Sequence, residues 1–116
     1  MSNSPSLEIP AVDAAVVLQR TPPPSAALLL LDCRTAEEHA TAKIAGSMLL
    51  PMQELPERVA EIAAWKEKPI VVHCHHGMRS LRVAKWLREQ GFSLAQSMQG
   101  GIDAWSTNVD PNVPRY

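Results

Sequence analysis

The sequence predicts an α/β domain with a mostly parallel sheet and helices on both of its faces. Strand-like apolar segments alternate with helix-patterned segments along the chain, which is typical of β–α–β units. Two strand-like segments, 26–32 and 70–73, are almost continuously apolar, as expected of parallel strands buried on both faces. A chain of 116 residues with 46% apolar composition suits one compact domain with a single core.

The first half of the chain is predicted to contribute three strands and two helices. A short strand over 7–9 is followed by a helix over 11–19, which starts after a proline and is densely apolar. A run of three prolines forms a loop before the strand over 26–32. The next helix, over 35–42, starts at a threonine that can cap it and has acidic residues in its first turn. A glycine then precedes a short strand over 47–50.

The second half is predicted to contribute two strands and three helices. Apolar residues recur on one side of 54–66, with charged residues opposite, and a Lys-Pro pair ends this helix. The buried strand over 70–73 follows. Segment 80–90 has one apolar and one charged side, and a glycine stops it. A last strand over 94–98 precedes two glycines and a short helix that ends at Trp105.

Charge and hydropathy narrow the class of partner. A net charge of −1 gives no reason to expect nucleic acid or an anionic membrane as a partner. The longest apolar stretch is too short to span a bilayer, and the first residues lack the pattern of a signal peptide, which favours a cytoplasmic protein. We expect a flexible N-terminus over 1–6, the folded domain over 7–106 and an extended tail over 107–116.

The cysteines carry the strongest functional signal. Two of them, Cys33 and Cys74, are too few for a disulfide-stapled scaffold, so a reactive role fits better. Cys74 directly follows a buried strand, and a turn containing Gly77 leads into the next helix near Arg79 or Ser80. Free N–H groups at a helix start stabilise an anion and lower the pKa of a thiol. Cys74 is therefore the candidate nucleophile. Ser80 is interpreted first as a helix-start residue, and a hydroxyl placed near the sulfur is the second interpretation.

These residues resemble the rhodaneses, specifically the single-domain form of this sulfurtransferase family. The loop Cys74-His75-His76-Gly77-Met78-Arg79, followed by Ser80, is similar to the family's six-residue catalytic loop. Two flanking motifs also resemble those of the family: residues 31–34 with Glu37, 44–47 and Pro51, and residues 100–105. The resemblance covers about residues 7–105 and implies a central parallel sheet of about five strands and persulfide chemistry at Cys74.

Three positions differ from the family's usual pattern. His39 stands where an aromatic residue is usual, Ala42-Lys43 where Gly-His is usual, and Cys33 where valine is usual. The family's strand order implies that Cys33 lies on the strand beside that of Cys74. We therefore keep two interpretations of Cys33, a small strand residue and a thiol that forms a disulfide with Cys74 on oxidation.

The resemblance implies a two-step transfer of sulfur. Cys74 attacks the outer sulfur of an anionic donor such as thiosulfate, and cyanide, a thiol or a protein then accepts that sulfur. The backbone amides of 75–80 are expected to surround the transferred sulfur. Arg79 is expected to attract the anion, while His75 and His76 are either substrate contacts or exposed loop residues. The scheme needs neither a metal nor an organic cofactor.

Other residues near the loop are expected to support it. Asp32 and Arg34 end the neighbouring strand, and we expect them to form a fixed ion pair or hydrogen-bonding set that orients the strand end. A role of Arg34 in attracting an anion stays open. Gly77 is predicted to allow either a positive φ or a close approach of the backbone. His73 is interpreted as a structural residue that hydrogen-bonds to the backbone, and Met78 as apolar lining.

Three other functions remain as alternatives. Cysteine-dependent phosphatases and arsenate reductases use a Cys-x5-Arg loop, whereas Arg79 makes this loop Cys-x4-Arg, which favours a single sulfur over a phosphate. A metal site made of residues 73–76 is disfavoured because four consecutive residues do not converge on one ion. A rhodanese module that relays sulfur to a protein stays open. The donor is also open among thiosulfate, mercaptopyruvate and protein-bound persulfides.

Overall fold

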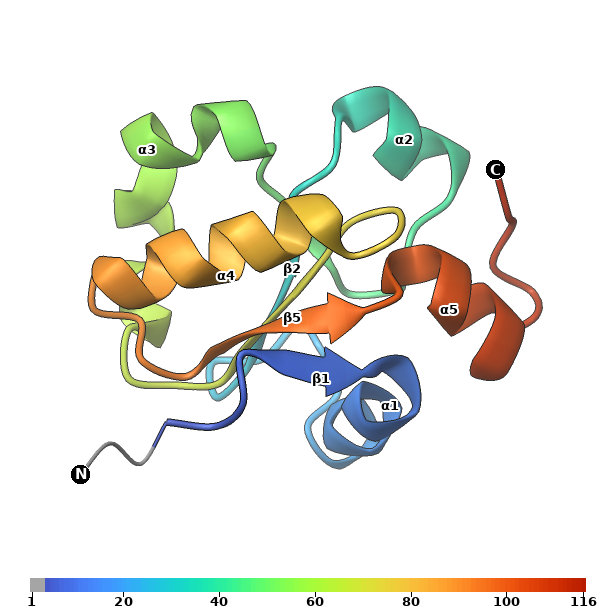
Figure 1. The fold of residues 1–116 in the computed structure, drawn as a ribbon, viewed down its shortest axis with the longest axis horizontal. Coiled ribbons are helices and arrows are strands. Elements are labelled where there is room, and N and C mark those ends of the chain that lie inside the picture. Colours follow the sequence, from blue (N-terminus) through green and yellow to red (C-terminus); the bar gives the residue numbers. More distant parts are fainter. Residues whose placement is uncertain (1–3) are drawn as a thin grey trace.

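The protein is built around one five-stranded parallel sheet (Figure 1). The computed structural model describes residues 4–116, and its strands lie in the order β1-β5-β4-β2-β3. The strands are β1 (Glu8–Pro10), β2 (Leu29–Asp32), β3 (Met48–Leu49), β4 (Ile70–His73) and β5 (Ala95–Gln99). The predicted fold class is confirmed.

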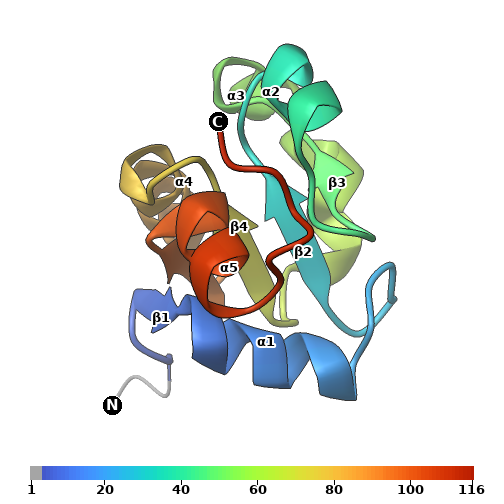
Figure 2. The same ribbon diagram turned by 90° about the vertical axis from the view of Figure 1, so that its right-hand side faces the viewer.

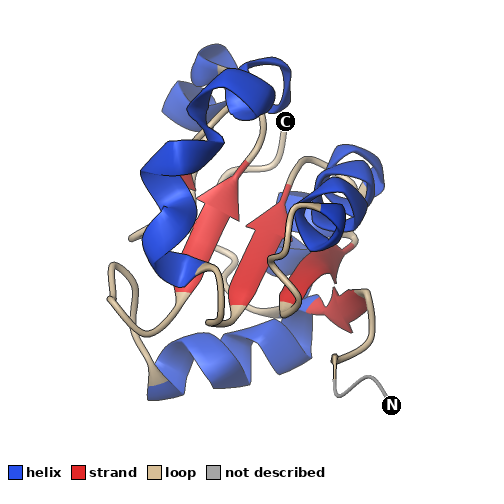
Figure 3. Ribbon diagram, turned by 90° about the vertical axis from the view of Figure 1, so that its left-hand side faces the viewer, coloured by secondary structure: helices blue, strands red, loops and turns tan. Residues whose placement is uncertain are grey.

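Helices cover both faces of the sheet, so that the strands form a middle layer (Figure 3). The helices are α1 (Ala11–Arg20), α2 (Ala36–Thr41), α3 (Leu55–Arg58), α4 (Met78–Glu89) and α5 (Gly101–Asn108), with 3-10 turns η1 (Met52–Glu54) and η2 (Val59–Trp65). Side chains alternate along β2, because Leu30 packs with α1 and α5 while Leu29 and Leu31 pack on the side of α3 and α4.

Three helices differ from their predicted limits. The predicted helix over 54–66 divides into α3 and the 3-10 turn η2. Of its residues only Leu55 and Ile62 are buried, so packing does not impose regular α geometry along the whole segment. Helix α4 begins at Met78, earlier than predicted, because the chain turns into it directly through a left-handed glycine. Helix α5 continues beyond Trp105 to Asn108.

The segment after α5 packs back onto the domain. Val113 is buried in the core cluster on the α1 and α5 side of the sheet. Figure 2 shows the segment running from α5 past the end of β2 toward α2. Part of the predicted flexible N-terminus, residues 1–3, lies outside the described residues. Over residues 4–116, no helix combines the length and apolar character that a bilayer span requires.

The carboxyl ends of the two central strands meet at one edge of the sheet. Strand β2 pairs with β4 so that Asp32 is opposite His73, and the chain continues from there into Arg34 and Cys74. Ligands of open α/β folds bind at this edge. The sheet therefore brings the two predicted site segments together.

Candidate active site

The sulfur of Cys74 lies in a small cradle of backbone N–H groups. Cys74 follows β4 and is only 1% exposed. Its Sγ accepts the Gly77 N–H at 3.0 Å and the Ser80 N–H at 3.4 Å. Both donors belong to the start of α4, where N–H groups lack partners within the helix. The arrangement favours negative charge on this sulfur.

Glycine is required where the loop turns into α4. Gly77 has a φ of +104°, which confirms the predicted positive φ. A Cβ at this position would also lie 3.2 Å from the backbone nitrogen of Gly100. The close approach fixes the loop against the segment that leads into α5.

The start of α5 holds the first residues of the loop. The Ile102 N–H donates to the Cys74 carbonyl at 2.9 Å, and the Asp103 N–H donates to the His75 carbonyl at 3.1 Å. A Cβ on Gly101 would collide with these same carbonyls. The glycine pair therefore lets a second helix N-terminus approach the loop and anchor it.

Two serines are linked to the sulfur by a chain of hydrogen bonds. The Cys74 thiol donates to the Ser80 Oγ at 3.4 Å, and Ser80 also lies in the first turn of α4, so the residue fits both of its interpretations. The Ser80 hydroxyl is also 2.7 Å from the hydroxyl of Ser97, a fully buried residue of β5. Sequence reasoning missed Ser97, because a small polar residue inside a short strand gives no signal of its own.

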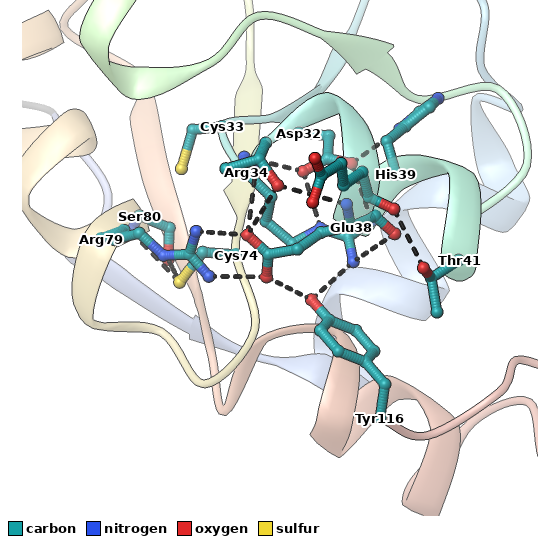
Figure 4. Close-up of polar contacts among 12 residues, drawn as sticks. Asp32, Cys33, Arg34, Glu38, His39, Thr41, Cys74, Arg79, Ser80 and Tyr116 are labelled. Atoms are coloured by element: carbon teal, nitrogen blue, oxygen red, sulfur yellow. Dashed lines mark hydrogen bonds and ion pairs between the residues drawn. The ribbon is translucent and has the colours of Figure 1, made fainter.

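Arg79 is paired with an acidic residue. Its guanidinium makes a two-pronged ion pair with Glu38 of α2, at 2.6 and 2.9 Å (Figure 4). Hydrogen bonds from Arg79 hold the pKa of Glu38 far below its usual range, and those from Glu38 raise the pKa of Arg79. The charge expected to attract a substrate anion is thus balanced by a carboxylate that the sequence analysis did not include in the site.

The predicted ion pair between Asp32 and Arg34 is present and buried. Arg34 Nε lies 2.9 Å from Oδ1 and Nη2 lies 2.8 Å from Oδ2 of Asp32. Burial opposes ionisation of Asp32, but the bonds from Arg34 and other nearby groups outweigh it and lower the pKa of Asp32. His39, which replaces the family's usual aromatic residue, places its Nδ1 2.7 Å from Asp32 Oδ2.

Tyr116 reaches the site from the far end of the chain. Its hydroxyl donates to Glu38 Oε2 at 2.6 Å and accepts from Arg34 Nη1 at 2.7 Å (Figure 4). Its ring stacks on His75, with ring centroids 4.0 Å apart and planes 8° from parallel. Burial and the bond to Glu38 raise the pKa of Tyr116 to about 12. Sequence reasoning treated this residue as part of an extended tail.

His75, His76 and Asp103 are the group among residues 4–116 that offers ligand atoms to a metal. These atoms lie within 4.8 Å of one another. However, Asp103 already pairs with Arg115 at 2.9 Å, and the side chain of His76 is 63% exposed. Two of its members belong to the active loop, but the group does not include the sulfur of Cys74.

One predicted supporting role is refined and one is corrected. His73 is fully buried, as its structural interpretation expects; its ring nitrogens have no hydrogen bond of ordinary length among the described residues, but the backbone of Cys74 is close enough to favour its protonation. Burial lowers the pKa of His73 to about 4, so its imidazole is neutral at pH 7. Met78 does not form buried lining, because it is 72% exposed.

Cys33 directly follows β2, the strand that pairs with β4, and both thiols are free. The Cys33 thiol donates to the His73 carbonyl at 3.5 Å. Burial raises the pKa of Cys33 well above its usual range, which makes it a poor nucleophile. The disulfide with Cys74 stays a hypothesis.

Fold and site together define an α/β domain whose buried cysteine is held among backbone donors at a helix start. The family model described as the rhodanese-like domain matches residues 14–108. The chain belongs to this family, and the resemblance found in the sequence is confirmed.

Curated relatives are named as sulfurtransferases. Adenylyltransferase and sulfurtransferase MOCS3 of Arabidopsis thaliana is 33% identical over 102 residues, which cover 76% of this chain and 22% of that protein. Thiosulfate sulfurtransferase GlpE of Coxiella burnetii is 36% identical over 81 residues, which cover 70% of this chain and 74% of that protein. The chain thus spans a small part of the first and most of the second. These relatives support sulfur transfer in general.

A solved structure agrees on the fold. The rhodanese-related protein of Thermoplasma volcanium superposes with a TM-score of 0.77 at 27% identity. The match covers 96% of this chain and 100% of that one.

Proposed function

We propose that this protein is a sulfurtransferase that carries a sulfane sulfur as a persulfide on Cys74. The single observation that carries the proposal is the pair of backbone N–H groups, from Gly77 and Ser80, directed at the Cys74 Sγ. Such donors stabilise a thiolate before the reaction and negative charge on the persulfide after it.

The first half-reaction loads the sulfur. The Cys74 thiolate attacks the outer sulfur of thiosulfate or a similar donor. A new S–S bond forms to Cys74, the S–S bond of the donor breaks, and sulfite leaves with the bonding electron pair. The Ser80 hydroxyl, next to the sulfur and tied to Ser97, holds the helix start in place during this step.

The second half-reaction unloads the sulfur onto a thiophilic acceptor. Cyanide, a thiol or a protein thiolate attacks the outer sulfur of the persulfide, and the Cys74 thiolate is the leaving group. The relatives named as thiosulfate sulfurtransferases support the choice of thiosulfate as donor. No step in this scheme calls on the His75, His76 and Asp103 group.

Intact-protein mass after incubation with thiosulfate tests the proposal. We expect the wild type to gain one sulfur atom and the variant Cys74→Ser to gain none, because serine cannot form the persulfide. Cys33→Val is the matched control and should still load, since valine suits the same strand position. Cyanide should then remove the added sulfur as thiocyanate. If the wild type takes no sulfur from thiosulfate, mercaptopyruvate or a thiol persulfide, the proposal is wrong.

A further inference from the structure

We propose that Tyr116 is a specificity-determining residue of the Cys74 site, selecting small sulfur donors over bulky ones. The inference rests on the proposed function, because it concerns which donors reach the Cys74 sulfur. It starts from a feature that the transfer chemistry does not use, a tyrosine at the end of the described chain that lies on the active loop.

The tail holds Tyr116 at the site through contacts of its own. Val113 is buried against the core, and the Val113 N–H donates to the Asp110 carbonyl at 3.1 Å. Arg115 Nε pairs with Asp103 of α5 at 2.9 Å. These contacts do not involve the Tyr116 side chain. The backbone path to the site is therefore set independently, and the phenol can be altered without releasing the tail.

Three side chains form a continuous row, which we call the entrance row: Arg79 lies next to the Cys74 sulfur, Glu38 follows, and Tyr116 is at the far end (Figure 4). The phenol donates to Glu38 Oε2 at 2.6 Å, and both oxygens of this carboxylate bind Arg79. The row thus connects the tail, α2 and the active loop. Cys74 behind it is almost fully buried.

Because Cys74 is almost fully buried, a donor has to move neighbouring side chains to reach the sulfur, and Arg79 with its partner Glu38 lies next to it. A small donor such as thiosulfate needs only a shift of the Glu38 and Arg79 side chains. A bulky donor such as glutathione persulfide must also move the Tyr116 ring from its stack on His75, where the planes are 8° from parallel. Displacing the ring therefore raises the free-energy barrier to the sulfur more for bulky donors than for small ones. This difference makes the site selective for small donors.

The hydroxyl adds a second contribution. It donates to Glu38 and accepts from Arg34 Nη1 at 2.7 Å, so it ties the row to the buried Asp32–Arg34 pair. Without it, the row opens more often, and access increases in proportion to the open population. Loss of a hydrogen bond of ordinary net strength corresponds to an increase of about fivefold in the population of the open row.

Alkylation of Cys74 measures access without any sulfur chemistry. The rates with iodoacetamide, a small reagent, and with N-ethylmaleimide, a bulkier one, are followed by intact mass in a Cys33→Val background, where Cys74 is the single thiol. Because both reagents need the same thiolate, the ratio of the two rates cancels any change in ionisation. We expect Tyr116→Ala to raise the maleimide rate by about fivefold or more and to increase the ratio of maleimide to iodoacetamide rates.

Two further variants separate the contribution of the Tyr116 ring from that of its hydroxyl and from that of the rest of the tail. Tyr116→Phe keeps the ring on His75 and removes the hydroxyl, so both rates should rise while their ratio stays near that of the wild type. Arg115→Gln removes one tail contact, but the buried Val113 and the bonds of the phenol itself still hold Tyr116 in place, so the two rates and their ratio should stay near those of the wild type. In turnover, Tyr116→Ala should raise kcat/KM for glutathione persulfide more than for thiosulfate.

An unchanged alkylation ratio in Tyr116→Ala, with circular dichroism like that of the wild type, would overturn the inference. The same holds if Arg115→Gln changes the ratio as much, because the whole tail would then set access. Failure of Cys74 to load sulfur would contradict the proposed function instead, and the alkylation ratio would still decide the role of Tyr116.

Discussion

At the scale of single residues, the most unusual group is the buried His73. Its imidazole is neutral in the folded protein at pH 7, because burial disfavours the charged form and neither ring nitrogen has a hydrogen bond of ordinary length among residues 4–116. The nearby Asp32 carboxylate favours protonation but does not outweigh burial. The residue therefore affects stability in acid.

The pH dependence of folding should show this effect. The unfolded His73 titrates near pH 6.5, whereas in the folded protein its pKa is about 4. Below pH 6.5 the unfolded state binds a proton that the folded state does not, so the free energy of unfolding falls as pH decreases toward 4. Between pH 7 and pH 5 we expect His73 to account for a loss of about 2 kcal/mol.

Urea unfolding of the wild type and of His73→Leu at a series of pH values measures this loss. The variant should be less sensitive to pH over that interval, and above pH 7 the two curves should run parallel. If the free energy of unfolding changes equally with pH in both proteins between pH 5 and pH 7, the His73 imidazole protonates in the folded protein without loss of stability.

At the scale of elements, the junction between β4 and α4 depends on Gly77. Its positive φ is unfavourable for alanine, and an added Cβ would press on the backbone of Gly100. We expect Gly77→Ala to cost about 1–3 kcal/mol of stability and to abolish sulfur loading, because the displaced N–H no longer points at Cys74. Urea unfolding and intact mass after thiosulfate treatment measure the two effects.

Gly91 is a matched control for this substitution. It has a φ of +96° just after α4, and an added Cβ there would meet only the flexible end of Lys66. Gly91→Ala should lose stability through the same backbone strain but load sulfur normally. Similar loading by both variants would mean that the Gly77 conformation is not needed for the cradle.

At the scale of the whole molecule, Arg34 joins three parts of the structure. It binds Asp32 at the end of β2, the Glu38 and Ala42 carbonyls in and after α2, and the hydroxyl of Tyr116 in the tail. Its side chain is fully buried. A buried ion pair is costly to break, because the remaining charge is left without a partner.

We expect Arg34→Met to lower the free energy of unfolding by about 3–5 kcal/mol. Arg58→Met, which removes an arginine that pairs with Glu54 and Glu61 on the surface, should change stability little. Denaturant unfolding of both variants tests the contrast. Equal losses would mean that burial does not set the strength of the Arg34 pair.

The sequence predicts those features that depend on neighbouring residues. The strand over 70–73, the capping threonine before α2 and the glycine turn before α4 each have a local pattern, and the structure contains all three. The six-residue loop is local as well. Such features follow from periodicity, capping and backbone conformation alone.

Contacts between distant residues could not be predicted in this way. Glu38 meets Arg79 across 41 positions, and Tyr116 meets Glu38 across 78. An acidic residue in the first turn of a helix is explained locally by the helix dipole, so nothing in its surroundings indicates an ion pair with the loop. Tyr116 lies in a segment without periodicity. These partners become visible only when the sheet brings α2, the loop and the tail together.

The two helix starts that border the active loop have a consequence for its electrostatic potential. Helices α4 and α5 both direct backbone N–H groups at residues of the loop, α4 at the sulfur and α5 at two carbonyls (Figure 1). The negative charge of Glu38 balances the positive charge of Arg79. The peptide dipoles at the two helix starts therefore supply the positive potential that remains at Cys74. Peptide dipoles have no proton to lose. The loop therefore keeps this potential at every pH at which the protein stays folded.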